Sequence, residues 1–274
     1  MTGRTGCARG MALVAVLWML AALSGAALGL SAWVRSEARL RQADVARLNA
    51  TAAAQAALVH VLAAHPWGGG SPPARQRWTV TVLDTPVQID WSTAQAAIDI
   101  NRAPQDLLQA VLAHAGGLPS DAAARWAAAI VQTRADPALS GRPAYDAVED
   151  LLTRPGLPFP VWMAVQSLLT VDSDDPALDP QAVDDSLLIV LAQGDAGRAA
   201  AWARARSMQT DGDLSTIPAP WIRQTPGNRW KAVAHVQTED GTFQVTWMLV
   251  QGAPMADRSP WRLLRQTVRW VPSG

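Results

Sequence analysis

The chain has 274 residues, of which 49% are hydrophobic, and its 23 Lys and Arg balance 23 Asp and Glu, so the formal net charge is zero. This composition is typical of a globular chain with one apolar segment, and it gives no overall electrostatic preference for nucleic acid or an anionic membrane. The single cysteine, Cys7, excludes a framework of intramolecular disulfides.

A long apolar run lies close to the start of the chain. From Met11 to Val34 no residue is charged, and this run of 24 residues exceeds the roughly 20 that a helix needs to cross a bilayer. We therefore expect a transmembrane helix over 11–34. A cleaved secretory signal is the alternative, because Gly25-Ala26-Ala27 and Leu30-Ser31-Ala32 have the small residues of a signal peptidase site.

The predicted helix should continue well beyond the apolar run. Residues Ser36 to Ala64 contain neither Pro nor Gly and are rich in Ala, Leu, Arg and Gln, which favour helix. Pro66 and the glycines after it should end it. We predict one helix over 11–65, apolar all round in its first half and amphipathic in its second. Trp18 lies inside the predicted span, and Trp33 lies at its edge, where tryptophan marks a membrane interface.

The residues before the apolar run form a short basic leader. Arg4, Arg9 and Gly10 stand directly before Met11. This leader, followed by a long helix with an apolar first half, resembles the type IV pilin and pseudopilin family. The resemblance implies that a prepilin peptidase cuts residues 1–10 away between Gly10 and Met11, and that the new N-terminus is methylated.

One departure from the family pattern narrows the resemblance. The family usually has Glu at the fifth mature position, which here is Ala15. A carboxylate inside a bilayer needs a partner, which in these filaments is the N-terminal amine of the next subunit along. A subunit with nothing beyond it needs no such Glu. The K-type minor pseudopilins of the type II secretion system characteristically lack it, so Ala15 strengthens the similarity to them.

Sheet-forming patterns lie on both sides of the middle of the chain. Residues 72–97 contain two alternating segments, Trp78 to Leu83 and Val87 to Trp91, which predict a hairpin turning at Asp84-Thr85-Pro86. Residues 229–274 predict two further strands joined across Glu239-Asp240-Gly241, and then a third. We assign the two ranges to one small antiparallel sheet.

The range between them, 98–228, has the pattern of an inserted helical domain. Pro104 suits a first helical turn, Gly116-Gly117 a stop, and Ser120 the N-cap of a second helix with Asp121 at its positive end. After these, the sequence predicts a short helix, a break at Pro155-Gly156, and another helix ending near Thr170.

The insertion contains a faint internal repeat. "AIDINRAPQDLL" from Ala97 and "ALDPQAVDDSLL" from Ala177 share Ala, Asp and Leu-Leu at an offset of 80 residues. A duplicated helical unit and a chance match in an Ala-, Asp- and Leu-rich chain are both open. The phrase "IDINRAP" with "DLL" also resembles the start of the helical insertion of K-type pseudopilins.

Taken over nearly the whole chain, the resemblance implies an α+β pseudopilin fold. It implies a single-pass protein of the bacterial inner membrane with its body in the periplasm. There it would join the I- and J-type minor pseudopilins, form the tip of the pseudopilus and initiate its assembly for protein secretion. The other implied partners are the remaining pseudopilins, the inner-membrane platform and the prepilin peptidase.

The same stretch also resembles helix-hairpin-helix or SAM-like modules, some of which bind DNA through a loop such as Gly116 to Pro119. From Asp99 to Arg154, however, seven acidic residues outnumber five arginines, which disfavours phosphate binding. A minor type IV pilin or DNA-uptake subunit, or an anchored protein with a DNA-binding module, remains the alternative.

The sequence gives no sign of an enzyme. The four histidines have no metal-ligand spacing, and no H-E-x-x-H, G-x-S-x-G or phosphate-loop motif occurs. The acidic run from Asp172 to Asp185 is the candidate cluster for a metal, and the family resemblance makes calcium the ion to consider. The run lacks the spacing of an EF-hand, so a solvated loop is the competing interpretation, and no ligand residues are assigned.

Overall fold

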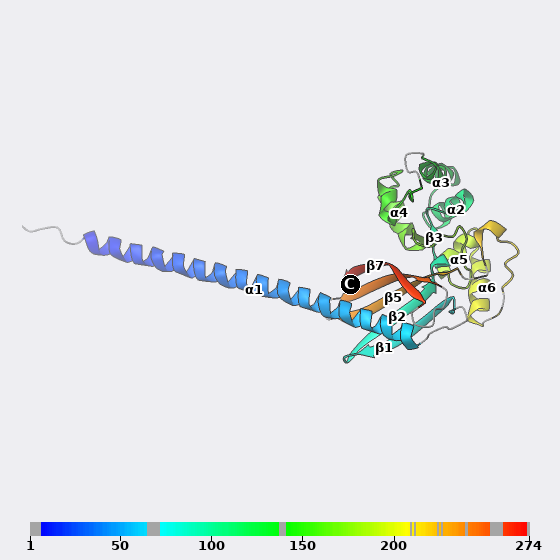
Figure 1. Cartoon of the computed structure of the whole chain (residues 1–274). Helices are drawn as coiled ribbons and strands as arrows, with labels where there is room; N and C mark the ends of the chain where they lie inside the picture. The colour runs from blue at the N-terminus through cyan, green and yellow to red at the C-terminus, as the bar shows by residue number, and fades with distance from the viewer. Residues whose placement is uncertain are drawn as a thin grey trace, which may run out of the picture. The chain divides into compact units, whose positions relative to one another are not determined.

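The computed structural model describes residues 7–64, 72–136, 141–208, 210, 212–223, 225, 227–238, 241–252 and 260–272. The chain divides into two compact units, Met1–Ala52 and Ala53–Gly274. The second unit contains the end of the first helix, a five-stranded sheet and a helical insertion (Figure 1).

The long helix α1 spans Cys7–Ala64. The structure describes α1 up to Ala64, and the predicted last residue, His65, lies with the Pro66 stop signal outside the described residues. The predicted start at Met11 belongs to the cleaved chain, and in the uncut chain α1 begins four residues earlier. The physical reason is that residues 7–10 contain no proline, and a single glycine, Gly10, lowers helix stability without breaking the hydrogen-bonded backbone.

The sheet is antiparallel, as predicted, and both parts of the chain contribute to it. In the order β1-β2-β5-β6-β7, its strands are β1 Arg75–Val82, β2 Thr85–Thr93, β5 Arg229–Thr238, β6 Gly241–Gln251 and β7 Trp261–Pro272. Thr93 and Trp230 lie opposite each other where β2 ends and β5 begins. The insertion therefore leaves and re-enters the sheet at neighbouring points.

The hairpin between β1 and β2 is confirmed, but the predicted turn at Asp84-Thr85-Pro86 is wrong. The two turn residues are Leu83 and Asp84, with φ of 46° and 64°. Two positive φ values in a two-residue turn match the right-handed twist of the strands that it joins. Pro86 is accommodated in β2 because the pairing of β2 with β5 begins at the next residue, Val87.

One face of the sheet is apolar and covered by the last turns of α1. Within the second unit, Ala54, Ala57, Leu58 and Val61 of this helix are buried, and the end of α1 runs along the strands (Figure 1). The small alanines let the helix backbone approach the sheet closely, while the aromatic side chains that fill the remaining space come from the strands.

Tryptophans form the centre of this apolar face. The Trp91 and Trp230 rings are stacked with centroids 5.4 Å apart, and the Trp261 ring meets Trp91 edge-on at 5.3 Å. Offset stacks and edge-on contacts are the favourable geometries for aromatic pairs. Three of the 13 tryptophans of the chain thus pack together and stabilise the sheet.

The insertion is mainly helical, as predicted. Its elements are β3 Ile98–Asp99, α2 Gln105–His114, α3 Ser120–Arg134, η3 Val148–Leu152, α4 Phe159–Val165, η4 Gln166–Leu168, β4 Leu169–Thr170, α5 Asp185–Leu191, α6 Ala196–Ser207 and η5 Ala219–Trp221. The short strands β3 and β4 pair in parallel and form a second, two-stranded sheet.

Several predicted helix ends shift in the structure. Helix α2 ends at His114, before Gly116-Gly117 as expected, and Gly117 has the positive φ of 69° that glycine permits. The prediction of Ser120 as an N-cap is wrong: the cap is Pro119, whose fixed φ suits a helix entrance, and Ser120 is the first helical residue. Asp121 lies in the first turn, as predicted.

The segment after α3 follows the predicted plan, with shorter elements. The expected short helix is the 3-10 segment η3, and the next helix, α4, ends at Val165 and not near Thr170. A 3-10 turn and strand β4 follow α4, because Leu169 and Thr170 pair with β3. This long-range pairing outweighs the local helix pattern.

The internal repeat is real in the structure. Helices α2 and α5 begin at Gln105 and Asp185, which are 80 residues apart, as are the two matching sequences. The turn before α2 is closed by Asn101 N–H to Asp99 Oδ1 at 2.8 Å and Ala103 N–H to Asp99 O at 2.8 Å.

The turn before α5 is closed in the same way. Gln181 N–H donates to Asp179 Oδ1 at 2.9 Å, and Val183 N–H donates to Asp179 O at 3.1 Å. Each aspartate also belongs to a short parallel pairing, β3 with β4 in one case and the Leu178–Ile222 bridge beside the other. Two copies of one unit, a strand and turn followed by a helix pair, therefore build the insertion.

Candidate functional site

The site residues predicted at the N-terminus lie on α1. Gly10, Met11, Ala15 and Val34 fall within the helix, but their side chains lie outside the described residues. Trp18 and Trp33 are described and are 72% and 65% exposed.

Among the residues that the structure describes, no helix combines the length and the apolar character of a membrane span.

The phrase "IDINRAP" builds the entrance to the insertion. Asp99 is buried, and its carboxylate accepts N–H bonds from Asn101 at 2.8 Å and from Asp174 at 2.7 Å. Burial raises the pKa of Asp99 above its ordinary value, although these two bonds act in the opposite direction. Asn101 in turn binds the backbone of Tyr145 through both amide atoms, at 2.9 and 3.1 Å. These polar residues hold distant loops together.

The acidic run from Asp172 to Asp185 forms an ionic joint between the insertion and the sheet. Asp174 binds Arg102 of the insertion at 2.8 Å and Arg229 of β5 at 2.9 Å. Asp172 lies 3.6 Å from Arg265 of β7. Because these pairs are partly exposed, each contributes little by itself, and their value lies in fixing the orientation of the loop.

The remaining carboxylates of the run are also engaged. Asp175 pairs with Arg223 at 3.3 Å and Asp185 with Arg206 at 2.6 Å, while Asp184 accepts the Leu187 N–H at the start of α5. Within the described ranges, no group of three or more His, Cys, Asp or Glu is placed to hold a metal ion. A set of carboxylates already bound by arginines and backbone N–H groups does not fit a calcium site.

The hairpin between α2 and α3 was the candidate DNA-binding loop. Two of its amides are used internally: Gly116 N–H binds Val111 O at 3.0 Å, and Leu118 N–H binds Leu112 O at 3.1 Å. The nearest cation along the chain, Arg125, pairs with Asp121 at 2.9 Å. With two of its amides used internally and this arginine paired, the loop offers little for the phosphate binding of a DNA-binding hairpin.

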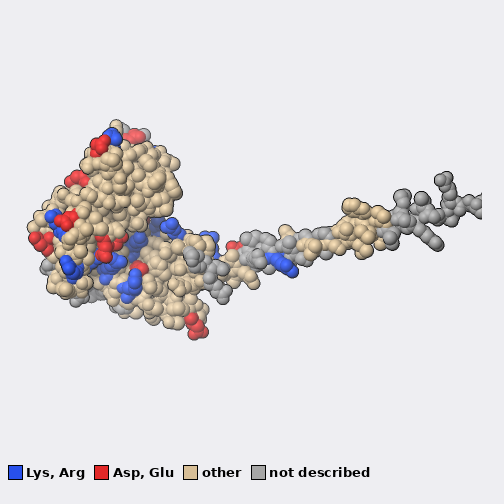
Figure 2. Space-filling view, turned by 180° about the vertical axis from the view of Figure 1, so that it is seen from behind, with Lys and Arg blue, Asp and Glu red and all other residues tan. Residues whose placement is uncertain are grey.

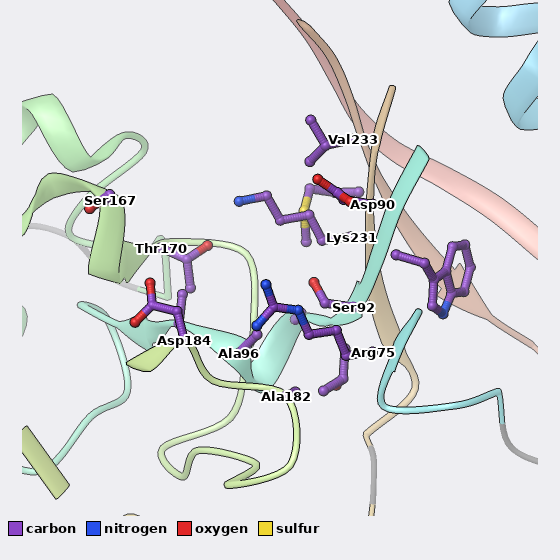
Figure 3. Close-up of a pocket in the computed structure, with 15 residues that line it drawn as sticks. Arg75, Asp90, Ser92, Ala96, Ser167, Thr170, Ala182, Asp184, Lys231 and Val233 are labelled. Carbon is purple, nitrogen blue, oxygen red and sulfur yellow. The ribbon is translucent and has the colours of Figure 1, made fainter. Parts of the chain in front are cut away.

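A cavity of about 190 Å³ lies between the sheet and the insertion (Figure 3). Arg75 and Lys231 point into it from β1 and β5, and the Thr170 hydroxyl faces them from the insertion. Burial lowers the pKa of Lys231, and the charge of Asp172 partly opposes this effect. Sequence reasoning missed this cavity, because it depends on a pairing between β2 and β5 across the whole insertion.

Comparison with known proteins identifies the fold. The chain matches a chain of the crystal structure of the GspK-GspI-GspJ complex from the enterotoxigenic Escherichia coli type 2 secretion system, with a TM-score of 0.58 and 11% sequence identity. The match covers 85% of this chain and 99% of that one. No protein-family model and no curated protein matches the sequence. The expected mixture of helices and an antiparallel sheet is therefore a fold that the solved complex also contains.

Proposed function

We propose that the protein is a K-type minor pseudopilin of a type II secretion system. The observation that carries this proposal is the fold likeness, which extends over 99% of a chain from a complex of GspK, GspI and GspJ. At 11% identity the likeness concerns the fold. The assignment of a function rests on this likeness together with the basic leader, Gly10 and Ala15.

Two features favour the K type over other pseudopilins. The helical insertion lies between the adjacent strands β2 and β5, so it extends a small sheet domain without interrupting its hydrogen bonding. Ala15 stands where a subunit inside a filament would carry Glu. A bulky insertion and a missing carboxylate both suit a subunit that has no neighbour beyond it.

The proposed work is assembly and not catalysis. The apolar run 11–34 anchors the chain in the inner membrane, and the body lies in the periplasm. There the protein joins the I- and J-type minor pseudopilins, occupies the tip of the pseudopilus and starts its assembly. The presence of GspI and GspJ beside GspK in the solved complex supports the choice of these two partners.

The test is co-purification from cells that express the full chain with the I- and J-type pseudopilins of the same secretion system. We expect a single detergent-solubilised complex containing all three proteins by size-exclusion chromatography with mass analysis. Another pseudopilin of the same system, which by family resemblance also has a long apolar helix, is the matched control and should not replace either partner. A chain that elutes without I and J would contradict the proposal.

The DNA-uptake alternative has less support. The Gly116 and Leu118 amides of the hairpin are occupied, and Arg125 of α3 is paired with Asp121. Loss of DNA uptake with normal secretion in a deletion strain would reverse this preference.

A further inference from the structure

The face of the sheet opposite the tryptophans is rich in cations. The pairing register places Arg75, Ser92, Lys231, Met248 and Arg265 in one row across all five strands. Because side chains alternate between the two faces of a strand, this row faces away from Trp91 and Trp230. We call this side of the sheet the open face.

Neighbouring rows have the same character. Arg77 and Asp90 lie in the next row, and Arg269 lies in the row after it, while Arg229 and Arg262 flank the row on its other side. Among the described residues of the five strands, Asp90 is the one acidic residue on this face. Blue side chains gather on the body in the view from behind (Figure 2).

Three of these cations are paired. Arg77 binds Asp90, and Arg229 and Arg265 bind Asp174 and Asp172 of the insertion. Arg75, Lys231, Arg262 and Arg269 form no ion pair with any residue that the structure describes. The open face thus has several cations in excess, although the chain as a whole is neutral.

The cavity opens on this face of the sheet, because Arg75, Ser92, Lys231 and Met248 of the row line it. The Lys231 ammonium and the Arg75 guanidinium point into it, with the Ser92 and Thr170 hydroxyls nearby (Figure 3). Two carboxylates also line it, but both have partners: Asp90 binds Arg77 and His235, and Asp184 caps α5. A volume of about 190 Å³ holds several molecules of water and accommodates one carboxylate side chain.

The charge of Asp172 offsets only part of the cost of burying a lysine in this place, so a further anion would stabilise it. The side chain is largely withdrawn from water, which is why the pKa of Lys231 is lowered. A methionine in its place would avoid this penalty. A residue that lowers stability and points into a cavity is a candidate for binding.

We propose that the open face binds an acidic segment of another protein, and that one carboxylate of this segment enters the cavity between Lys231 and Arg75. A protein segment fits better than a nucleic acid because the acidic joint Asp172–Asp175 borders the face and would repel a continuous phosphate backbone. The carboxylates of an acidic peptide are spaced along the chain, so they can contact the unpaired cations without lying against Asp172–Asp175. The inference does not rest on the pseudopilin proposal.

The experiment measures binding of a fluorescent octaglutamate peptide to the full chain in non-ionic detergent, by anisotropy, at increasing salt. We expect binding that weakens with salt, since exposed charges are screened. Arg75→Ala and Lys231→Met should each weaken it about fivefold or more, in the range of one lost charge pair near a protein surface.

The matched control is Arg125→Ala. It removes the same charge from an exposed arginine on α3, away from the open face, and should change the affinity less than about twofold. Lys231→Met should leave the unfolding midpoint unchanged or raised, which separates lost binding from lost folding. Arg75 is exposed on an edge strand, so its removal offers a second variant that does not depend on the core.

Four results would overturn the proposal: no peptide binding at low salt, an equal loss in Arg125→Ala, tighter binding of a short DNA duplex than of the peptide, or displacement of the peptide by free glutamate at equal carboxylate concentration. The third would indicate a nucleic-acid surface, and the fourth a site for a small metabolite. An octalysine peptide should not bind.

Discussion

Asp99 and Asp179 do the same structural work in the two halves of the insertion, but Asp99 accepts one hydrogen bond more. Both carboxylates bind the N–H two residues ahead, and Asp99 also binds Asp174 N–H at 2.7 Å. The duplicated unit therefore provides its own comparison between two buried carboxylates.

The two asparagine variants should differ. In Asp99→Asn the amide nitrogen replaces one acceptor oxygen and leaves an N–H donor unpaired, which should lower the free energy of unfolding by about 1–3 kcal/mol. Asp179→Asn keeps its one acceptor and should be neutral or stabilising. Urea unfolding of the full chain, followed by tryptophan fluorescence, measures both. Equal losses would show that the extra bond contributes nothing.

The buried carboxyl of Asp179 should also make stability depend on pH. Burial raises its pKa above the ordinary value of 3.8, so the folded state holds the proton more tightly than the unfolded state does. The resulting stabilisation is fully present below the ordinary pKa and is lost as the pH rises through the raised pKa. The free energy of unfolding of Asp179→Asn should therefore increase relative to that of the parent protein as the pH rises from about 3 to about 7.

Asp121 serves as the control, because its pKa is shifted in the opposite direction to that of Asp179. A hydrogen bond from Arg125 lowers its pKa, so its contribution is present above the ordinary value and lost in acid. Asp121→Asn should show a small deficit that disappears at low pH. The same trend for both variants would mean that the Asp179 environment does not raise its pKa.

Processing should occur at the predicted junction. If a prepilin peptidase recognises the leader, mass spectrometry of the mature chain finds Met11 at the N-terminus, with a methyl group. Gly10→Ala should slow cleavage modestly, and Gly10→Val should block it because the side chain is bulkier. A mature start near Leu28 or Trp33 would instead identify signal peptidase and contradict the pilin-type assignment.

The missing carboxylate can be restored in Ala15→Glu. With no subunit beyond it, the new Glu lies in hydrocarbon without a partner amine, at a cost of about 2.5–3.5 kcal/mol on insertion scales for a charged residue. Secretion should be unchanged or impaired. Ala15→Gln adds similar bulk without charge and is the control. Longer filaments in the Glu variant would place this subunit inside the shaft.

The insertion can be removed where the sheet closes behind it. Because Thr93 and Trp230 are opposite each other, deletion of Asp99 to Pro226 leaves a short loop between β2 and β5. The trimmed protein should still co-purify with the I- and J-type partners but fail to limit filament length. Filaments of normal length, seen by electron microscopy, would show that capping does not depend on the insertion.

Local patterns predicted most of the elements, and long-range pairing decided the rest. The end of α1, the hairpin and the α2–α3 pair follow from proline, glycine and alternation. The turn at Leu83 and Asp84 escaped prediction because neither residue usually signals two positive φ values. The end of α4 was misplaced because Leu169 and Thr170 pair with a strand about seventy residues earlier.

The same limit applies to the sites. Gly10 and Met11 are read from the sequence alone, and no described side chain tests them. Arg75 and Lys231 are far apart in the chain and unremarkable one by one. They become neighbours because Ser92 of β2 lies opposite Arg75 of β1 on one side and opposite Lys231 of β5 on the other. No local sequence pattern predicts this pairing.

The insertion is connected to the sheet through two adjacent strand ends, at Thr93 and Trp230. A force applied to the insertion is transmitted to the sheet through these strand ends and through the Gly227–Gln95 hydrogen bond of 2.7 Å. The ion pairs of Asp172 with Arg265 and of Asp174 with Arg229 also transmit it. Strand ends that are pulled together in one direction open their hydrogen bonds one after another, and partly exposed ion pairs exchange readily with water. We therefore expect a force on the insertion to open this connection first, before it disturbs the tryptophan core of the sheet.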